Sequence, residues 1–203
     1  MTNHNNLFTL LAGTTNQHKL DEIKQYLAGL PITLKTLNDF TAFPDVAENG
    51  RTFAANARKK ARVYFEFFKI PTFVDDSGLI VPALNGEPGV RSARYAGPDA
   101  EYEQNNRKLI QRIAALDQKQ PEAQFICTIC YKDGEQEVLF TGTVNGTILT
   151  ELRGTAGFGY DPLFYIPDLG KTYAEISIAQ KNALSHRGQA LRKFKMFLEN
   201  KIL

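Results

Sequence analysis

The chain has 203 residues, of which 43% are hydrophobic and 23% charged, and its formal net charge is +2. This composition is typical of a globular protein in water, long enough for one domain with a substantial core. Both signs of charge are spread along the chain, and the longest apolar runs are far shorter than a membrane span, so the sequence indicates neither nucleic-acid binding nor membrane insertion. The N-terminus lacks a basic region ahead of an apolar one, so we expect no signal peptide and a cytoplasmic protein.

The first third of the chain predicts alternating strands and helices. Residues 7–12 form a short apolar run typical of a buried strand, and residues 32–37 alternate between apolar and polar like a second strand. Between them, apolar residues recur at helical spacing over residues 20–30. A long amphipathic helix is predicted over residues 53–68 and a third strand over residues 72–74. This order favours an α/β sheet with helices on its faces.

The rest of the chain begins with residues 77–98, a segment rich in glycine and proline that we expect to form a long ordered loop. Pro98 is expected to open a further helix. Residues 123–144 are typical of a β-hairpin with its turn at residues 133–134, and an amphipathic helix capped by Ser185 is expected to end the chain. Together these elements predict a mixed α/β fold.

The two cysteines, Cys127 and Cys130, form a single C-x-x-C pattern within β-branched and aromatic residues. A zinc or redox site needs a second ligand pair or a helix-capping context. Because residues three apart on a strand point to opposite faces, we expect two reduced cysteines in a buried strand of a cytosolic protein.

The turn after the first predicted strand, "GTTNQHK" at residues 13–19, has residue types suited to binding an anion. Asn16 is the expected helix cap. Lys19 falls in the first helical turn, where the helix dipole disfavours a cation unless it faces a bound phosphate. An ordinary capped turn with a solvent-facing lysine explains the pattern equally well, and the segment is not a Walker A loop.

Two adjacent carboxylates, Asp75 and Asp76, close the third predicted strand ahead of Ser77 and Gly78. Successive strand side chains point in opposite directions, so we expect one carboxylate to enter a cleft and the other to cap the turn. Ligands bind at the carboxyl ends of strands in α/β sheets, and Mg²⁺ takes one or two protein carboxylates. A simple surface turn is the alternative.

Two further segments, the start of the long predicted helix and a glycine-rich loop, contain candidate binding residues. Asn56 and Lys60 are four residues apart and share a helix face just after Glu48, although a solvated face would look the same. Phe158, in a glycine-rich loop, is a natural platform for stacking on a base, although the loop lacks the last glycine of a dinucleotide fingerprint.

The segment "SHRG" at residues 185–188 places His186 and Arg187 in the first turn of the last helix, where basic residues are disfavoured. Hydrogen-bond donors at such a position indicate an electron-rich partner, such as a carbonyl oxygen or a phosphate.

Six segments, taken together in their order along the chain, indicate a protein family more specifically than any single segment does. They are Thr14-x-Asn16-x-x-Lys19, Phe53-x-x-Asn56-Ala57-x-x-Lys60-Ala61, Asp75-Asp76-Ser77-Gly78-Leu79, "PGVRSARYAG" at 88–97, Gly157-Phe-Gly-Tyr-Asp-Pro162 and Ser185-His-Arg-Gly188. Together, and in this order, they resemble the inosine triphosphate pyrophosphatase (Ham1/RdgB-like) family. The resemblance runs from the first predicted strand to the last helix and so covers essentially the whole chain.

The resemblance implies one two-lobed domain over residues 1–203, with a mixed central sheet, flanking helices and an active-site cleft between the lobes. It implies hydrolysis of deaminated purine nucleoside triphosphates (ITP, dITP and XTP) to the monophosphate and pyrophosphate, which cleanses the nucleotide pool. Mg²⁺ is the implied cofactor. A homodimer is the implied assembly, with no nucleic-acid or membrane partner.

The resemblance also implies roles for particular residues. Glu48 and Asp76 are the implied Mg²⁺ ligands; Asp76 is also the implied proton acceptor for the attacking water, and Lys19 a second catalytic residue. For the triphosphate and its surroundings the implied residues are Thr14, Thr15, Asn16, Gln17, His18, Lys19, Asn56, Lys60 and Lys181. For the rest of the substrate they are Ser77, Phe158, Gly159, Tyr160, Asp161, His186 and Arg187. Phe158 would stack on the purine, and donors of the His186–Arg187 turn would meet the 6-keto oxygen that adenine lacks.

Two positions depart from the family pattern, since Thr15 stands where many members have glycine and Ala55 where many have glutamate. Residues 88–97 are expected either to form a subunit contact or to line the cleft. Two rival functions stay open. One is a Maf-like pyrophosphatase for pyrimidine or methylated nucleotides, which "SHRG" argues against; the other is a catalytically silent purine sensor.

Overall fold

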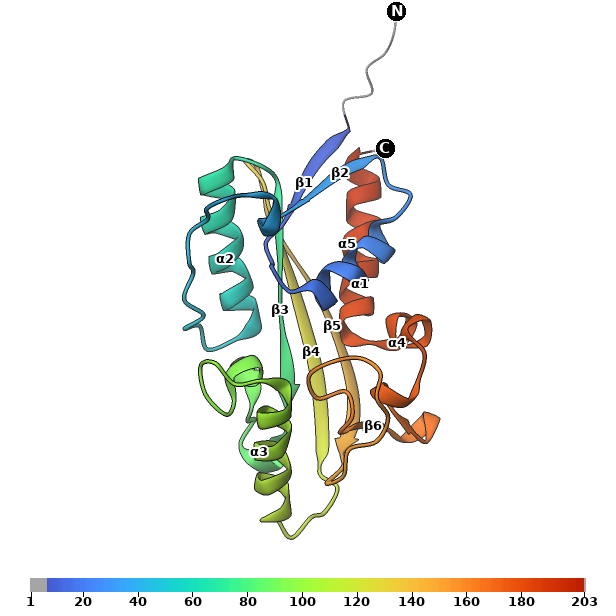
Figure 1. Cartoon of the computed structure of the whole chain (residues 1–203). Helices are drawn as coiled ribbons and strands as arrows, with labels where there is room; N and C mark the ends of the chain where they lie inside the picture. The colour runs from blue at the N-terminus through green and yellow to red at the C-terminus, as the bar shows by residue number, and fades with distance from the viewer. Residues whose placement is uncertain (1–6, 203) are drawn as a thin grey trace, which may run out of the picture. The chain divides into compact units, whose positions relative to one another are not determined.

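The computed structural model describes residues 7–202 and has a mixed α/β fold, as the sequence predicts (Figure 1). Its strands are β1 (Phe8–Ala12), β2 (Ile32–Thr36), β3 (Thr72–Ile80), β4 (Glu122–Lys132), β5 (Glu137–Ile148), β6 (Phe164–Ile166) and β7 (Lys171–Thr172). Its α-helices are α1 (Gln17–Leu27), α2 (Phe53–Phe68), α3 (Tyr102–Ala114), α4 (Ile178–Leu184) and α5 (His186–Ile202). None of the helices within residues 7–202 combines the length and the apolar character needed to cross a membrane.

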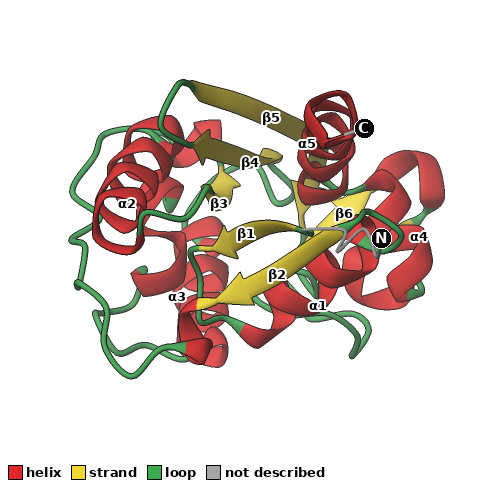
Figure 2. Ribbon diagram, turned by 90° about the horizontal axis from the view of Figure 1, so that it is seen from above, coloured by secondary structure: helices red, strands yellow, loops and turns green. Residues whose placement is uncertain are grey.

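The strands form a seven-stranded sheet in the order β2-β1-β3-β4-β5-β6-β7. The strand β1 pairs in parallel with both β2 and β3, and Figure 2 shows β1 and β2 side by side. The later pairs, β5 with β6 and β6 with β7, are antiparallel. The register places Ala12, the last residue of β1, opposite Phe73 near the start of β3, so β3 continues beyond the end of β1.

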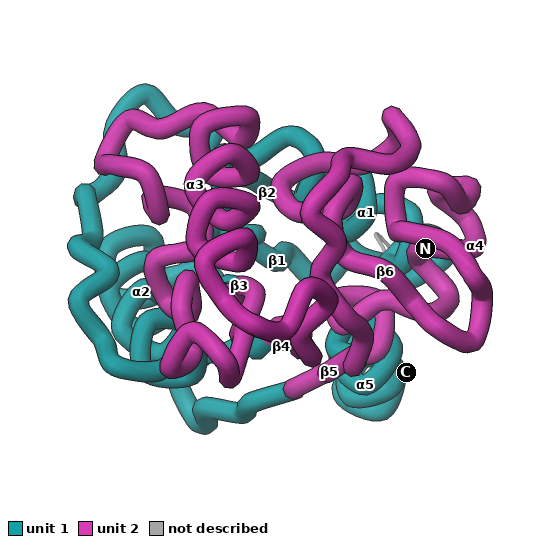
Figure 3. Tube along the Cα trace, turned by 90° about the horizontal axis from the view of Figure 1, so that it is seen from below, with its two compact units in different colours: residues 1–76, 128–140, 190–203 teal, residues 77–127, 141–189 magenta. Residues whose placement is uncertain are grey.

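The described part of the chain divides into two compact units (Figure 3). Unit 1 contains the described residues up to Asp76, residues 128–140 and the described residues from Ala190 onward. Unit 2 contains residues 77–127 and 141–189. The division falls between Asp76 and Ser77, inside the paired-aspartate motif. The predicted cleft between two lobes stays a prediction.

The core of unit 1 forms where the buried face of α2 meets β1 and β3. Of the residues that predict α2, Phe68 is half-buried and the others are buried, as helical spacing requires: Phe53, Ala57, Ala61 and Tyr64. A Cβ atom at Gly13 would lie 2.5 Å from Val74 Cγ2, so only glycine lets the chain leave β1 this close to β3.

The core of unit 2 joins α3 to β4 and β6. Leu109 and Ile113 on α3 are fully buried in one cluster with Phe125 and Phe164, whose ring centroids are 4.6 Å apart. This cluster lies beneath the glycine-rich loop at residues 157–161, because Tyr160 belongs to it.

The prediction that β3 ends at residue 74 and is followed by a long loop is wrong. The strand continues through the whole Asp-Asp-Ser-Gly motif to Ile80, so neither aspartate caps a turn. Beyond it, residues 82–84 and 89–94 form short 3-10 helices. The turn-forming residues stay in an extended conformation because β3 lies between two neighbouring strands, β1 and β4. Apolar residues also resume at Leu79.

The prediction that Pro98 opens a helix is also wrong, since α3 begins at Tyr102. Glu101 is its N-cap, and the Glu101 backbone N–H donates to Gln104 Oε1 at 2.8 Å. This side-chain cap fixes the start of the helix at Tyr102. The sequence reading also missed α4, β6 and β7, which are too short to show a clear period.

The hairpin and the state of the cysteines are confirmed. Cys127 and Cys130 are fully buried in β4 as free thiols, and burial raises the pKa of the Cys130 thiol to about 12. A buried thiol with so high a pKa is a poor nucleophile. We therefore expect neither cysteine to react with a thiol reagent in the native protein, and both to react after unfolding; rapid modification before unfolding would contradict this.

Candidate active site

The turn between β1 and α1 in unit 1 is built from its own side chains. Asn16 caps α1 as predicted, because Asn16 Oδ1 accepts from Lys19 N at 3.2 Å. Thr14 Oγ1 in turn accepts from Asn16 N at 3.2 Å. Thr15, Gln17 and His18 are exposed around the helix start. The turn therefore presents polar groups at a helix N-terminus, where an anion is favoured.

Lys19 is not a solvent-facing lysine. Its Nζ lies 3.0 Å from Asp75 Oδ2 and donates to the Asp75 backbone oxygen at 3.4 Å. The Asp75 side chain is 1% exposed and that of Lys19 is 18% exposed. Asp75 thus offsets the poor position of a cation in the first turn of α1 and holds the ammonium group beside β3.

Asp76 is a buried carboxylate with perturbed acidity. Burial raises its pKa to about 6, the negative charges of Glu48 and Asp75 act in the same direction, and Lys19 and Asn56 oppose the shift. A carboxylate with a pKa near 6 is well suited to accept a proton at neutral pH.

Glu48 and Lys60 form an ion pair with 2.7 Å between Nζ and Oε1. Burial alone would lower the pKa of Lys60, but the hydrogen bond and charge of Glu48 outweigh it and raise the pKa. Asn56, fully buried, accepts from Gly50 N at 2.8 Å and fixes the segment that carries Glu48. These contacts exclude a merely solvated helix face. Lys59, which the sequence reading missed, also donates to Ala47 O at 2.9 Å.

The acidic residues of unit 1 suit a hard cation. Glu48 and Asp76 offer carboxylate oxygens close enough for the charge of one to raise the pKa of the other. Such oxygens are the ligands Mg²⁺ takes in small number, with phosphate and water completing its shell. Among residues 7–202 no group of three or more histidine, cysteine, aspartate or glutamate side chains is arranged to hold a metal ion. A pair of carboxylates is a donor set of the kind that Mg²⁺ takes from proteins.

The predicted base-binding residues gather in unit 2 around the loop at residues 157–161. Asp161 Oδ2 accepts from Phe158 N at 2.8 Å and from Lys181 Nζ at 2.5 Å, and both partners of the ion pair are buried. Gly157 has φ +77°, and a Cβ there would lie 2.1 Å from Asp161 Oδ2. Asp161 thus anchors the loop from within, and the partner of Lys181 in the structure is this carboxylate.

The ring of Phe158 is half-buried and lies close to two cations. Lys181 Nζ is 4.6 Å and Arg187 Cζ is 5.5 Å from its centroid. Arg187 also donates to Ser77 Oγ at 2.9 Å, so Ser77 holds the guanidinium group. His186 and Arg187 do begin α5, as predicted, and the imidazole of His186 stacks on Phe125 with 4.5 Å between centroids.

Two residues that hold this loop, Ser92 and Asn106, are not among the predicted site residues, and neither is Asn105 beside them. Tyr160 OH donates to the backbone oxygen of Ser92 at 2.9 Å, and Ser92 Oγ accepts from Leu79 N at 2.9 Å. Asn106 Nδ2 donates to Gly159 O at 3.0 Å. Asn105 Oδ1 accepts from Ala96 N at 2.8 Å. Two adjacent buried asparagines inside an amphipathic helix were a signal that could have been read.

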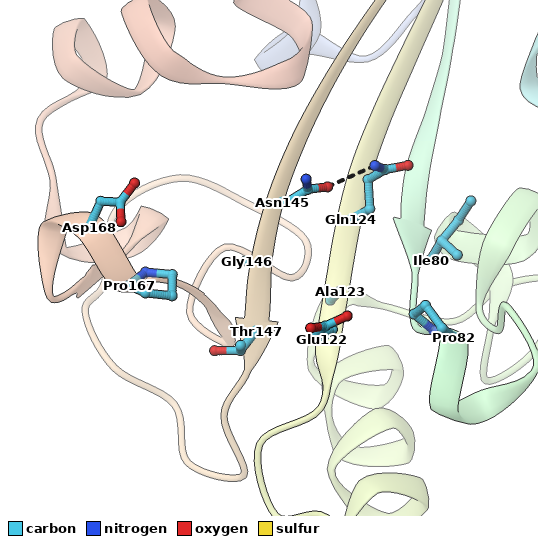
Figure 4. Close-up of a pocket in the computed structure, with 10 residues that line it drawn as sticks. All are labelled: Ile80, Pro82, Glu122, Ala123, Gln124, Asn145, Gly146, Thr147, Pro167 and Asp168. Carbon is cyan, nitrogen blue, oxygen red and sulfur yellow. Dashed lines mark hydrogen bonds between the residues drawn. The ribbon is translucent and has the colours of Figure 1, made fainter.

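A separate hollow of about 560 Å³ in unit 2 contains none of the predicted site residues. Figure 4 shows it over β4 and β5, where Gln124 Nε2 donates to Asn145 Oδ1 at 2.7 Å. Its charged residues are the acids Glu122 and Asp168, which would repel a triphosphate. It is therefore not the candidate active site.

Comparison with known proteins settles which family carries this arrangement. A model of the Ham1 family matches residues 10–197. The chain belongs to the Ham1 family. It is 48% identical over 187 residues to a protein of Geobacter sulfurreducens named dITP/XTP pyrophosphatase, covering 92% of this chain and 94% of that protein. A Lactobacillus johnsonii protein of the same name is 45% identical, covering 91% of this chain and 92% of the relative.

Solved structures of Ham1 proteins have the same fold. The Ham1 protein of Coxiella burnetii superposes with a TM-score of 0.89 at 37% identity, covering 95% of this chain and 99% of that one. That of Staphylococcus aureus superposes with a TM-score of 0.86 at 36% identity, with the same coverage. The ITPase-like α/β fold implied by the six segments is thus confirmed.

Proposed function

We propose that this Ham1-family chain hydrolyses ITP, dITP and XTP to the nucleoside monophosphate and pyrophosphate. The observation that carries the proposal is the buried carboxylate of Asp76, whose pKa is raised to about 6 beside Glu48, Asn56 and Lys19. Relatives 40–48% identical to the chain bear the name dITP/XTP pyrophosphatase. A buried, partly protonatable acid flanked by cations is a pattern of catalytic sites.

The triphosphate is bound by the turn that starts α1 and by the lysines of unit 1. Polar groups of residues Thr14 to Lys19 stand at a helix N-terminus, which favours phosphate oxygens. Lys19 and Lys60 are held by Asp75 and Glu48, and each keeps N–H donors in reserve beyond its ion pair. Hydrolysis of a phosphoanhydride requires charge neutralisation and an aligned water rather than a covalent nucleophile.

Asp76 accepts the proton of the attacking water, and Asn56 orients the Asp76 carboxylate. Glu48 and Asp76 would hold Mg²⁺. When bound, this ion supplies positive charge to the phosphate oxygens. Lys19, through Asp75, keeps a second positive charge near the same carboxylate.

The base is recognised by unit 2. Phe158 stacks on the purine, Gly159, Tyr160 and Asp161 shape the loop around it, and donors from the His186–Arg187 turn meet the 6-keto oxygen. The buried Lys181 adds a further donor beside Phe158. Adenine carries an amino group at this position, so a donor would face a donor and the ATP complex would be disfavoured.

Assembly as a homodimer in the cytoplasm completes the proposal. The resemblance to the family supports the dimer, and the two free buried cysteines suit a reducing compartment. Sedimentation of the purified protein tests the assembly.

The deciding experiment measures pyrophosphate release from ITP, XTP, ATP and GTP, with Mg²⁺ and with EDTA. We expect release from ITP and XTP only with the metal, and little from ATP. Equal turnover of ATP and ITP would refute base selection by the His186–Arg187 turn. Failure to hydrolyse any triphosphate, with retained purine binding, would favour the silent sensor. Preferred release from pyrimidine or methylated nucleotides would favour the Maf-like reading.

A further inference from the structure

Asn106 lies in the middle of α3 and is 6% exposed. Its Nδ2 donates to Gly159 O at 3.0 Å, joining α3 to a loop 53 residues further along the chain. Tyr102 lies one turn earlier on the same face of α3, with its ring centroid 6.0 Å from that of Phe158. One face of α3 therefore contacts two successive residues of the loop at 157–161.

Gly159 is the loop residue whose backbone oxygen is hydrogen-bonded to α3, whereas its neighbours have other partners. Phe158 and Asp161 are joined by a hydrogen bond of 2.8 Å, and Tyr160 is tied to Ser92 through its hydroxyl. Gly159 has φ +63°, and among the described residues no atom lies within 4 Å of where its Cβ would be. The turn from Phe158 to Asp161 encloses Gly159, and the hydrogen bond from Asn106 fixes it from outside the loop.

Within residues 7–202, the side chain of Asn106 has one unsatisfied polar atom. Its Oδ1 is buried, with no hydrogen-bond partner in the described part of the chain. A buried acceptor left unsatisfied costs free energy, and an apolar side chain of similar size would avoid that cost. An unsatisfied polar group of this kind calls for an explanation beyond core packing.

We propose that Asn106 is a positioning residue for base selection. By fixing Gly159 it sets the height and tilt of the Phe158 ring and the place of the Asp161–Lys181 pair beneath the purine. This inference rests on the proposed function, because the loop must be the one that meets the base.

The test replaces Asn106 with leucine, which has a similar size and no donor. We expect the KM for ITP to rise about tenfold, the effect of losing about one net hydrogen bond, while kcat changes less than about threefold. The ratio of kcat/KM for ITP over ATP should fall by a similar factor. The midpoint of thermal unfolding should fall only slightly, because Gly159 O loses one donor while the unsatisfied Asn106 Oδ1 is removed as well. The substrate ratio is the readout that a merely structural role would not move.

The matched control is Asn105→Leu. Asn105 is also buried on α3, but its side chain donates to Ala93 O and accepts from Ala96 N rather than touching the loop. We expect this variant to lose stability and to keep the substrate ratio of the wild type. An equal loss of selectivity in both variants would overturn the inference, as would an unchanged ratio in Asn106→Leu.

A second variant keeps the inference testable should leucine prevent folding. Asn106→Asp preserves shape but sets a carboxylate oxygen against Gly159 O, so KM for ITP should rise at pH 8 and approach the wild-type value as the new carboxyl group is protonated and can donate. A KM that equals the wild-type value at every pH would overturn the inference. The wild type separates the two proposals, since its failure to hydrolyse ITP rejects the proposed function itself.

Discussion

Replacing Asp76 with asparagine is expected to lower turnover of ITP by about 10²–10⁴-fold, the range that a positioned general base contributes. The amide has nearly the same shape and keeps one hydrogen-bonding oxygen, but it cannot accept the proton of the attacking water. It is also a poorer ligand for a divalent cation than a carboxylate. Pyrophosphate release under saturating ITP and Mg²⁺ measures the loss.

The same substitution is expected to stabilise the metal-free protein at neutral pH. The pKa of Asp76 is raised from an ordinary 3.8 to about 6, so the folded state favours the protonated acid. The stability this acid contributes is complete below about pH 4 and is lost as the pH rises through about 6. At pH 8 Asp76→Asn should therefore unfold with a free energy about 1–3 kcal/mol above the wild type, and the difference should vanish near pH 4. Urea unfolding in EDTA at several pH values measures it.

Asp75→Asn is the matched control for Asp76→Asn. Asp75 holds Lys19 at 3.0 Å, so losing its charge should loosen the lysine, raise KM and lower stability at neutral pH. Turnover at saturating ITP should fall far less than in Asp76→Asn. If Asp75→Asn is the inactive variant and Asp76→Asn stays active, the metal-facing acid has been assigned to the wrong residue.

Helices and hairpins were the predictable part of the fold because their signals are local. The apolar spacing of α2, the Asn16 cap of α1 and the turn at residues 133–134 each lie within a few residues of the element they define. The end of β3 was not predictable in this way. Its Asp-Asp-Ser-Gly segment has the composition of a turn, and only pairing with strands distant in sequence keeps it extended.

The motifs name candidate site residues, but the contacts that these residues make were not predictable from the sequence. The motifs identify Lys19, Asp161 and Arg187, and none of them reveals its partner. Lys19 pairs with a residue 56 positions away, Lys181 with one 20 positions away and Arg187 with one 110 positions away. Such pairs are decided by the tertiary fold, which a single sequence read for local pattern does not encode.

The contacts of Lys181 bear on the role that we propose for it. The resemblance to the Ham1 family implies that Lys181 binds triphosphate oxygens, and this stays a prediction. The structure places its ammonium group 2.5 Å from Asp161 Oδ2 and 4.6 Å from the centre of the Phe158 ring, in unit 2. These contacts hold the loop at residues 157–161, and we propose that Lys181 also presents a donor to the base.

Asp161→Asn is expected to destabilise the protein by about 3–5 kcal/mol, because it leaves the ammonium group of Lys181 buried without a counter-charge. Lys181→Met should cost less, since the carboxylate of Asp161 still accepts from Phe158 N. The double variant removes both charges together, so its stability should return to within about 1 kcal/mol of the wild type. Chemical unfolding of all four proteins closes this cycle.

Measuring the ITP over ATP preference of the same four proteins distinguishes a role of the Asp161–Lys181 pair in stability from a role in base recognition. If the pair serves the fold alone, the double variant should regain the ITP over ATP preference together with its stability. We expect instead that it regains only part of the preference, because neither asparagine nor methionine restores the ammonium donor of Lys181 next to Phe158. Recovery of wild-type selectivity in the double variant would show that Lys181 supports the loop without meeting the base, and discrimination would then rest on the His186–Arg187 turn.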